Sequence, residues 1–439
     1  SALNVFSYIR FIFFPFAICE ILQKNKKNLK FVYLILSFTI FVVVLDGYYQ
    51  FIFEKNFFGY EKYRIDRISG FFKDDLILGS FISRLLPLFI ALIIFFKDNL
   101  KLTNLNLFLF LSAFLLIFLT GERASFIIAS LALLIIIILI RSFFYLRLIF
   151  PFTLITLITI LMTFNPIIFD RYYNQLKNHI IKGSNVNMIL PNYMPMFKTS
   201  LKMFDDNKLF GQGPKSYRYY CSDEKFVTYF PDLIMIDNTV VKLPSNWKEL
   251  RNIEKLKLFV KEGDIIKKGD KILTYQYIGD EDSKVFLSDK EGKIEKILNS
   301  AGPLIKDRYV SHDIIMKITP QYSPNEVSIK KNACNTHPHN FYIQLLAETG
   351  LLGFISIFSL FIYISYLLVK NFIAKFFKNK SILNDSEICI LVGLFIVLWP
   401  LTTNGNFFNN WINLISFYPL GFLLYMSKSK NEKFENKLV

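Results

Sequence analysis

The sequence predicts a polytopic α-helical membrane protein whose large external loop contains a small all-β insert. Three observations lead to this prediction. The chain of 439 residues is 53% hydrophobic and 17% aromatic. Its Phe, Ile and Leu residues form runs longer than a soluble core needs, and between Pro231 and Pro320 these runs give way to short alternating segments. Because a helix crosses the hydrocarbon of a bilayer in roughly 20 apolar residues, the long runs indicate membrane spans.

About nine apolar stretches approach the length of a membrane span. In chain order they are 5–21, 31–45, 77–96, 104–120, 124–140, 143–164, 351–369, 387–403 and 411–426. Transmembrane helices are therefore expected in residues 1–164 and again in residues 341–439. The second set is expected to be followed by a C-terminal tail. The segment 165–340 lies between these two sets.

Lysine and arginine are concentrated in every second loop between the stretches, and short basic loops mark the cytoplasmic side. This alternation predicts a cytoplasmic C-terminus and an external position for both Ser1 and the segment 165–340. An external start without an initiator Met predicts an odd number of spans upstream, or a chain that begins mid-protein. The basic residues follow the first, third, fifth, seventh and last stretches: Lys24, Lys26, Lys27, Lys30, Lys97, Lys101, Arg141, Arg147, Lys370, Lys375, Lys378, Lys380, Lys428, Lys430, Lys433 and Lys437.

These loop residues account for much of the net charge of +16. Nucleic acid is therefore not expected as a partner, since the positive charge belongs to membrane topology.

A small β domain is predicted within the external segment, over residues 231–320. In "LKLFVKEGDIIKKGDKILTYQ", residues 256–276, Gly263-Asp264 and Gly269-Asp270 each follow an apolar strand. Gly-Asp turns between such runs are typical of hairpins. The pattern resembles the biotinyl/lipoyl type of barrel-sandwich hybrid. Lys284 is spaced too closely to Gly292 for a modified carrier lysine, so we expect a structural or partner-binding module.

Two of the four histidines, His337 and His339, flank Pro338 at the end of the external segment. Proline suits the first turn of a helix, which predicts that His339 lies at a helix N-terminus. The helix dipole there favours a neutral imidazole that can accept a proton. Gly350 follows His339 by three helical turns, so the two residues are expected on one face.

The His339-Asn340 pair, nine further residues and Gly350-x-x-Gly353 resemble the signature of the bacterial O-antigen ligase and O-antigen polymerase family. The resemblance implies a GT-C-type glycosyltransferase of the bacterial inner membrane whose active site faces the periplasm. It would move a glycan from a polyprenyl diphosphate to an acceptor hydroxyl and invert the anomeric carbon. Three weaker matches are "RISGFFKDDLILGSFISRLLP" at 67–87, "TGERAS" at 120–125 and "LFGQGPKSY" at 209–217.

The resemblance also implies roles for individual residues. His339 would be the catalytic base, with His337 and Asn340 as supporting residues. Arg123, at the external end of its span, would bind the diphosphate, since a guanidinium holds phosphate with two hydrogen bonds.

Further cations are candidates for the same diphosphate. Arg84 lies inside an apolar stretch, where a charge is costly, so it is a candidate ligand, with a structural pair to Asp74 or Asp75 as the alternative. The family's second arginine has no counterpart in residues 191–204, and Lys198, Lys202, Arg171 or Arg218 are candidates to replace it.

The remaining polar residues leave alternatives open. Cys221 and Cys334 both lie in the external segment, where oxidation is possible. They form either one disulfide or two free thiols, because the sequence does not show whether they meet. Glu348 is expected to pair with a lysine. No metal or other cofactor is expected, because no Cys or carboxylate is placed to complete a coordination sphere around His337 and His339.

Several functions compete. The leading one is O-antigen ligation to lipid A-core, and the nearest alternative is polymerisation of repeat units on the lipid carrier. A polyprenyl-glycan transporter, or an export adaptor whose β insert binds a protein partner, belongs to another class. A transporter needs charges along a path through several spans. Here the charges are concentrated at the external face, which favours an enzyme.

Overall fold

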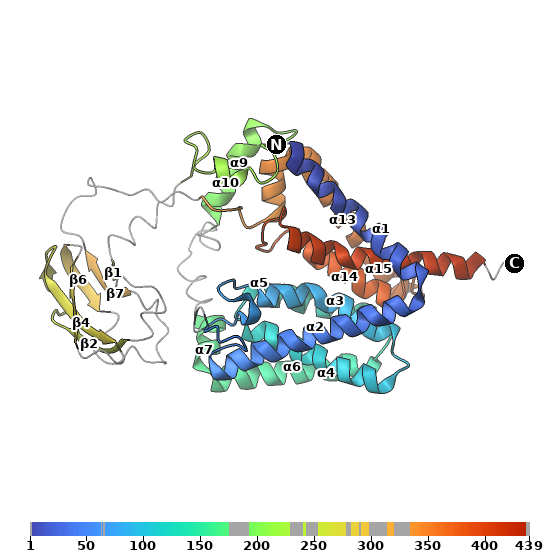
Figure 1. Cartoon of the computed structure of the whole chain (residues 1–439), viewed down its shortest axis with the longest axis horizontal. Helices are drawn as coiled ribbons and strands as arrows, with labels where there is room; N and C mark the ends of the chain where they lie inside the picture. The colour runs from blue at the N-terminus through green and yellow to red at the C-terminus, as the bar shows by residue number, and fades with distance from the viewer. Residues whose placement is uncertain are drawn as a thin grey trace. The chain divides into compact units, whose positions relative to one another are not determined.

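The computed structural model describes residues 2–62, 64, 66–174, 193–228, 240–242, 253–277, 282–288, 291–297, 314–319 and 334–435 (Figure 1). The chain forms two compact units. One comprises Ser1–Ile168, Met196–Phe226 and Cys334–Val439, and the other comprises Phe169–Pro195 and Val227–Ala333. The first unit is helical, and the second contains the β-strands.

The helices of the first unit fall on the apolar stretches of the sequence. Each predicted stretch overlaps one helix: α1 (Ala2–Lys24), α2 (Lys26–Phe53), α3 (Leu78–Phe95), α4 (Leu100–Leu119), α5 (Arg123–Leu139), α6 (Phe144–Phe164), α13 (Phe341–Phe377), α14 (Asp385–Val397) and α15 (Asn410–Glu435). The shorter elements are η1 (Gly70–Phe72), α7 (Pro166–Phe169), η2 (Asp170–Asn174), α9 (Met194–Asp206) and α10 (Tyr217–Tyr220).

The chain is a helical membrane protein. Four helices within the described part of the chain, namely α2, α3, α4 and α13, are long and apolar enough to cross a membrane. The number becomes five if α6 and the bent segment after it count as one span. The larger count of about nine spans stays a prediction.

Helices α3 and α14 form the centre of this unit. Helix α3 packs against α14, α4 and α5, while α14 also packs against α15 and α13 (Figure 1). Every residue of α14 from Ser386 to Leu394 is buried. Helix α14 has 13 residues, fewer than a membrane span needs. Its apolar surface faces other helices on all sides, as expected of a helix that is hydrophobic all round.

Two of the basic loops meet at one end of the helical unit. The Lys375 ammonium donates to the carbonyls of Ile138, Leu139 and Ile140 at the end of α5, at 2.7, 3.0 and 3.0 Å. The loop after α5 is also held, because the Arg141 N–H donates to Asp385 Oδ1 at 2.9 Å. The loops after the fifth and seventh predicted spans therefore lie on the same side, as their charge predicts.

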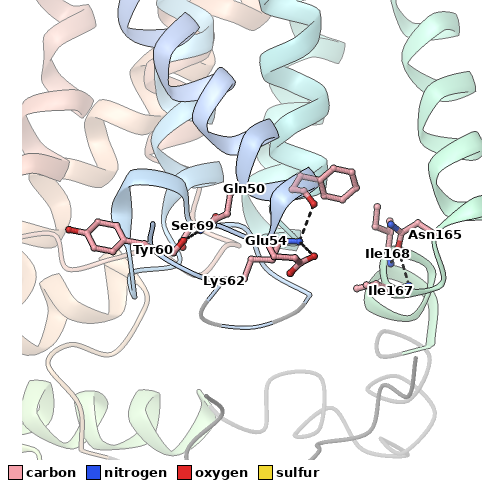
Figure 2. A network of polar contacts seen from close by, with 9 residues as sticks. Gln50, Glu54, Tyr60, Lys62, Ser69, Asn165, Ile167 and Ile168 are labelled. Carbon is pink, nitrogen blue, oxygen red and sulfur yellow. Dashed lines mark hydrogen bonds and ion pairs between the residues drawn. The ribbon is translucent and has the colours of Figure 1, made fainter. Parts of the chain in front are cut away.

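A polar cap connects α6 to α7. The Asn165 side chain accepts hydrogen bonds from the N–H groups of Ile167 and Ile168 at 3.1 and 3.2 Å (Figure 2). These bonds satisfy the first amides of a new helix, which have no partner within the helix itself. The chain direction changes here because Asn165 has extended backbone angles rather than helical ones.

The second unit contains two small antiparallel sheets. The four-stranded sheet has the order β1-β7-β6-β3 and the three-stranded sheet the order β2-β4-β5. The strands are β1 (Val240–Lys242), β2 (Ile253–Leu258), β3 (Ile265–Ile266), β4 (Lys271–Tyr277), β5 (Lys284–Leu287), β6 (Gly292–Ile297) and β7 (Ile314–Thr319). One core joins the sheets: Leu256, Ile266, Ile272, Leu273, Phe286, Ile294 and Met316.

The predicted Gly-Asp turns are confirmed. Gly263 and Gly269 have φ angles of 94° and 93°, which glycine adopts without the penalty of a Cβ. Asp264 accepts from the Lys261 N–H, and Asp270 from the Lys267 N–H, each at 2.7 Å.

The β character of the insert is thus established as two small sheets. A barrel-sandwich hybrid is not shown and stays a prediction. Parts of the predicted range 231–320, and of the second repeat at 285–307, lie outside the described residues.

Candidate functional site

The segment that leads into α13 holds the two histidines just outside the helix. Asn340 is the N-cap, and its side-chain oxygen accepts from the N–H groups of Tyr342 and Ile343 at 3.0 and 3.1 Å. The prediction that Pro338 opens the helix is therefore wrong. His339 precedes the cap and has a φ of 61°, so it does not share a helical face with Gly350.

The two histidine rings lie against each other, with their centroids 4.2 Å apart. His339 Nε2 is 3.2 Å from the Asn335 amide nitrogen, and His337 Nδ1 is 2.9 Å from the Thr336 hydroxyl. Burial lowers the pKa of His339 below its ordinary value. Burial, and then the nearby His339, lowers the pKa of His337 to about 4. Both imidazoles are consequently neutral near pH 7 and can accept a proton.

Helix α13 is broken at Gly350, and a glycine turn from the middle of the chain docks onto the break. Gly350 has φ 61° and ψ −160°, a conformation open essentially to glycine alone. A Cβ on Gly350 would lie 2.4 Å from the Leu209 carbonyl carbon. A Cβ on Gly211 would lie 2.5 Å from the Glu348 carbonyl carbon. Both glycines are thus required for the two backbones to touch.

Backbone hydrogen bonds hold this crossing together. The N–H groups of Gln212 and Gly213 donate to the carbonyls of Ala347 and Glu348 at 2.9 and 2.8 Å. In return, the Leu351 N–H donates to the Lys208 carbonyl at 2.8 Å. The groups that the helix loses at its break are therefore paired with the 209–217 segment. The structure thus brings together two stretches, 209–217 and 335–354, that the sequence identified separately.

The Glu348 carboxylate fixes the same turn from inside the helix. It accepts from the N–H groups of Lys215 and Tyr217 at 2.8 and 3.0 Å, and from the Gln344 amide at 3.1 Å. The expectation that Glu348 pairs with a lysine side chain is wrong, because its hydrogen bond to Lys215 comes from the backbone.

A third segment completes the site. The Asn404 N–H donates to the His339 carbonyl at 2.8 Å. The Gln344 amide donates to Asn406 Oδ1 at 2.8 Å and accepts from the Phe407 N–H at 2.9 Å. We call the three segments 209–217, 334–350 and 404–407 the His339 junction.

A disulfide joins two distant segments of the chain beside the junction. The structure pairs Cys221 with Cys334, with Cα atoms 5.0 Å apart. Of the two alternatives that the sequence leaves open, the structure therefore contains the disulfide. The bond connects α10, which carries Arg218, to the segment that carries the histidines. Arg218 is exposed, and its charge acts on both His337 and Glu348.

The first helix brings Tyr8 and the cation Arg10 beside the junction. Lys215 Nζ lies 5.5 Å from the ring centre of Tyr8, whose hydroxyl donates to the Phe408 carbonyl at 2.6 Å. Arg10 donates to the Asn410 side chain at 2.9 Å. Sequence reasoning missed these residues. The Asn-rich stretch 402–410 and the Gly-rich stretch 209–217 were the available signals.

A second polar cluster joins the 67–87 and 120–125 stretches. The two oxygens of the Glu122 carboxylate accept from the N–H groups of Gly79 and Ser80 at 2.8 and 3.0 Å. Arg67 Nε donates to the Thr120 carbonyl at 3.1 Å. Burial raises the pKa of Glu122, while the charge of Arg67 opposes this shift. We call this set, together with Arg84, the Glu122 cluster.

Arg84 belongs to this cluster and is 5% exposed. Its guanidinium donates to the Ser80 carbonyl at 2.9 Å, and its charge is attracted by Glu122. The hydrogen-bond partner of Arg84 is therefore Ser80, one turn earlier in α3, and the described residues contain no ion pair with Asp74 or Asp75, so that suggested pair is wrong.

The loop that carries Arg67 is anchored to the end of α2. Gln50 Oε1 accepts from the Ser69 N–H at 3.0 Å, and buried Lys62 pairs with Glu54 at 2.9 Å (Figure 2). These contacts hold the C-terminal end of α2 against the chain that leads to α3.

The remaining candidate cations lie apart from these networks. Arg123 opens α5 and is half-buried, and its side chain makes no hydrogen bond or ion pair with any residue that the structure describes. Lys198 lies exposed on α9. Arg123 is thus a partly shielded guanidinium at a helix N-terminus, which makes it available for an anion.

Residues 107–240 match the family model described as O-antigen ligase. No curated protein and no solved structure matches the chain. The matched stretch includes Arg123, Arg218 and the 209–217 segment, whereas His339 and Gly350 lie outside it. The match supports a membrane protein that ligates or polymerises glycans, a class that acts on a lipid-linked glycan and an acceptor.

Proposed function

We propose that this chain is a glycosyltransferase of the bacterial inner membrane, with its active site on the periplasmic face. It transfers a glycan from a polyprenyl diphosphate to an acceptor hydroxyl, and the O-antigen ligase match favours lipid A-core as the acceptor. The observation that carries the proposal is the His339 junction. There the 209–217 and 335–354 stretches, both of which resemble the family, meet at Glu348 and Gly350, and the second stretch carries the neutral His339.

His339 is the proposed base. Its ring is neutral at physiological pH, so it can take the proton of an acceptor hydroxyl as the hydroxyl attacks the anomeric carbon. Attack from the face opposite the diphosphate inverts that carbon. His337 and Asn340 support the base: His337 packs on its ring, and Asn340 fixes the start of α13 through the Pro400 carbonyl at 2.9 Å.

Cations are proposed to bind the diphosphate as negative charge grows on it. Arg123 is the first candidate, because its side chain is half-buried and has no hydrogen bond or ion pair in the described part of the chain. Arg218 is the second, since its charge acts on His337. Arg84 is a weaker candidate, because Glu122 already balances its charge. Lys198 is the remaining candidate for the missing family arginine. Side chains supply both charge and base in this scheme, which therefore requires no metal.

The glycolipid profile of a deletion strain tests this proposal. If the chain is a ligase, the strain accumulates free lipid A-core and keeps long polymer on the carrier. Core capped with a single repeat unit would instead identify a polymerase. An unchanged profile, with glycan export lost, would favour a transporter or an adaptor whose β insert binds a protein partner.

A further inference from the structure

Glu348 is a buried carboxylate with an unusual set of partners. The residue is 0% exposed, and all three of its hydrogen bonds come from nitrogen donors: two backbone amides and one side-chain amide. A buried charge is costly unless hydrogen bonds compensate it. The number and geometry of these bonds indicate that the carboxylate organises the chain around it.

The segment that Glu348 holds is a turn that needs support. Lys215 has a φ of 64°, which is unfavourable for a residue with a side chain. Glu348 holds this turn in two ways, because its carbonyl accepts from the Gly213 N–H and its carboxylate accepts from Lys215 and Tyr217. Both ends of the turn therefore depend on one residue of α13.

The turn ends at Arg218. Tyr217 is fully buried, which fixes the start of α10, and Arg218 follows it on the exposed side. The disulfide from Cys221, the C-cap of α10, to Cys334 holds this short helix beside the segment that carries the histidines, and the Arg218 charge acts on His337. A displacement of the turn would move Arg218 away from the histidine pair.

Glu348 is also connected to the other side of the junction. Gln344 donates to both Glu348 and Asn406, at 3.1 and 2.8 Å. The segment that contains Asn406 also contains Asn404, which donates to the His339 carbonyl. The turn is therefore connected to the backbone of His339 by hydrogen bonds through Glu348 and Gln344 and by the short backbone segment from Asn406 to Asn404.

We infer that Glu348 is a positioning residue that holds the 213–217 turn and thereby places Arg218 on the side of the histidine pair. Its effect on glycan transfer rests on the proposed function, whereas its effect on the turn does not. The role assigned to Glu348 is therefore to hold the turn through its three nitrogen donors.

Hydrogen exchange and kinetics on the full chain in lipid nanodiscs test this inference. Glu348→Gln places an amide group where the carboxylate accepted from N–H donors, so at least one bond is lost. Amide exchange at 213–217 should accelerate about tenfold, the effect of losing one hydrogen bond to a buried charge. The matched control is Glu387→Gln, which removes another buried carboxylate, at the far end of α14, and should leave exchange at 213–217 unchanged.

A double-mutant cycle on transfer separates positioning from general damage. Glu348→Gln should raise the donor KM, and adding Arg218→Ala should cause little further loss, because Glu348 acts through Arg218. Additive losses, or unchanged exchange at 213–217, would overturn the inference. If Glu348→Gln does not fold, the same two experiments are made on Glu348→Asp. This variant keeps the carboxylate but has a shorter side chain.

The outcomes distinguish this inference from the proposed function. If the wild type transfers no glycan but Glu348→Gln loosens the turn, the proposed function fails and the positioning of the turn stands. If the wild type transfers glycan and exchange at 213–217 does not respond, the proposed function stands and the inference fails.

Discussion

The His339 junction and the Glu122 cluster are both polar regions of one helical unit, yet they are held together by different forces. In the junction, backbone groups, amide side chains and a disulfide connect three distant segments. In the Glu122 cluster, the charge of Glu122 acts with those of Arg67 and Arg84. The junction satisfies its one buried carboxylate, Glu348, with amide donors, whereas the cluster brings a carboxylate and guanidiniums together. This difference suits a base in the first region and anion binding beside the second.

Replacement of His339 by alanine tests the chemistry of the junction and should have the largest effect. We expect transfer to fall by about 10²–10⁴-fold, the range lost with a general base. The melting temperature should change little, because the carbonyl rather than the ring of His339 bonds Asn404. Transfer of a radiolabelled glycan in proteoliposomes measures this, and activity equal to wild type would exclude His339 as the base.

Gly350→Ala tests the architecture of the junction. The new Cβ would lie 2.4 Å from the Leu209 carbonyl carbon at a φ of 61°, so both contact and strain oppose it. We expect a loss of about 3 kcal/mol in unfolding free energy, since strain alone costs ~1–3 kcal/mol. Gly213→Ala is the control, because it shares a positive φ, of 98°, but meets no atom within 4 Å. Equal melting temperatures of the two variants would show that the crossing contributes nothing.

Arg123→Lys tests anion binding beside the Glu122 cluster. A single ammonium cannot reproduce the planar guanidinium fork. We expect transfer to fall about a hundredfold, as when one group that stabilises developing charge is lost. Arg141→Lys, beyond the other end of α5, is the matched control and should keep wild-type transfer. Full activity of Arg123→Lys would reduce Arg123 to a membrane anchor.

The pH dependence of stability should differ between wild type and His337→Asn. In the folded protein the pKa of His337 is lowered to about 4, below its ordinary value of 6.5. Between these pH values the unfolded chain binds more protons than the folded one. The contribution of neutral His337 to stability is therefore full above pH 6.5 and is lost as the pH falls towards 4. As the pH falls through this window, the melting temperature of the wild type should decrease more than that of His337→Asn. Parallel melting curves would contradict the assigned burial.

Removal of the β insert should have the smallest effect on the helical unit. The Cys221–Cys334 disulfide already holds the exit and return of the chain together. We expect a Gly-Ser linker in place of residues 229–332 to leave folding in the membrane intact. A linker in place of 225–328 should be less stable, because it also removes Phe226, which packs against Tyr217 and Cys221. Detergent-resistant melting compares the two. Failure of the first variant to insert would contradict this layout, and a folded but inactive variant would indicate that the insert binds the acceptor or a partner.

Much of the fold could be predicted from the sequence, because its signals are local. Apolar runs placed a helix on each predicted stretch, and paired Gly-Asp dipeptides located the β turns at 263 and 269. The basic residues in every second loop predicted that Lys375 and Arg141 lie at the same end of the bundle, and the structure has them there. The start of α13 was misplaced because Pro338 and Asn340 both carry N-terminal signals, and the side-chain cap of Asn340 decided between them.

The sequence by itself indicated which stretches are helical and which turns need glycine, and it suggested His339, Arg123 and Arg218 as candidate site residues. Only the tertiary structure decided how these groups are held. The Lys215 N–H meets the Glu348 carboxylate across 133 positions of sequence, and Asn340 meets the Pro400 carbonyl across 60. Helix periodicity and turn propensity act over a few residues, whereas a buried amide or carboxylate takes its partner from whichever segment packs against it. For this reason the motif at 335–354 was visible in the sequence, but its dependence on Glu348 and the 209–217 turn was not.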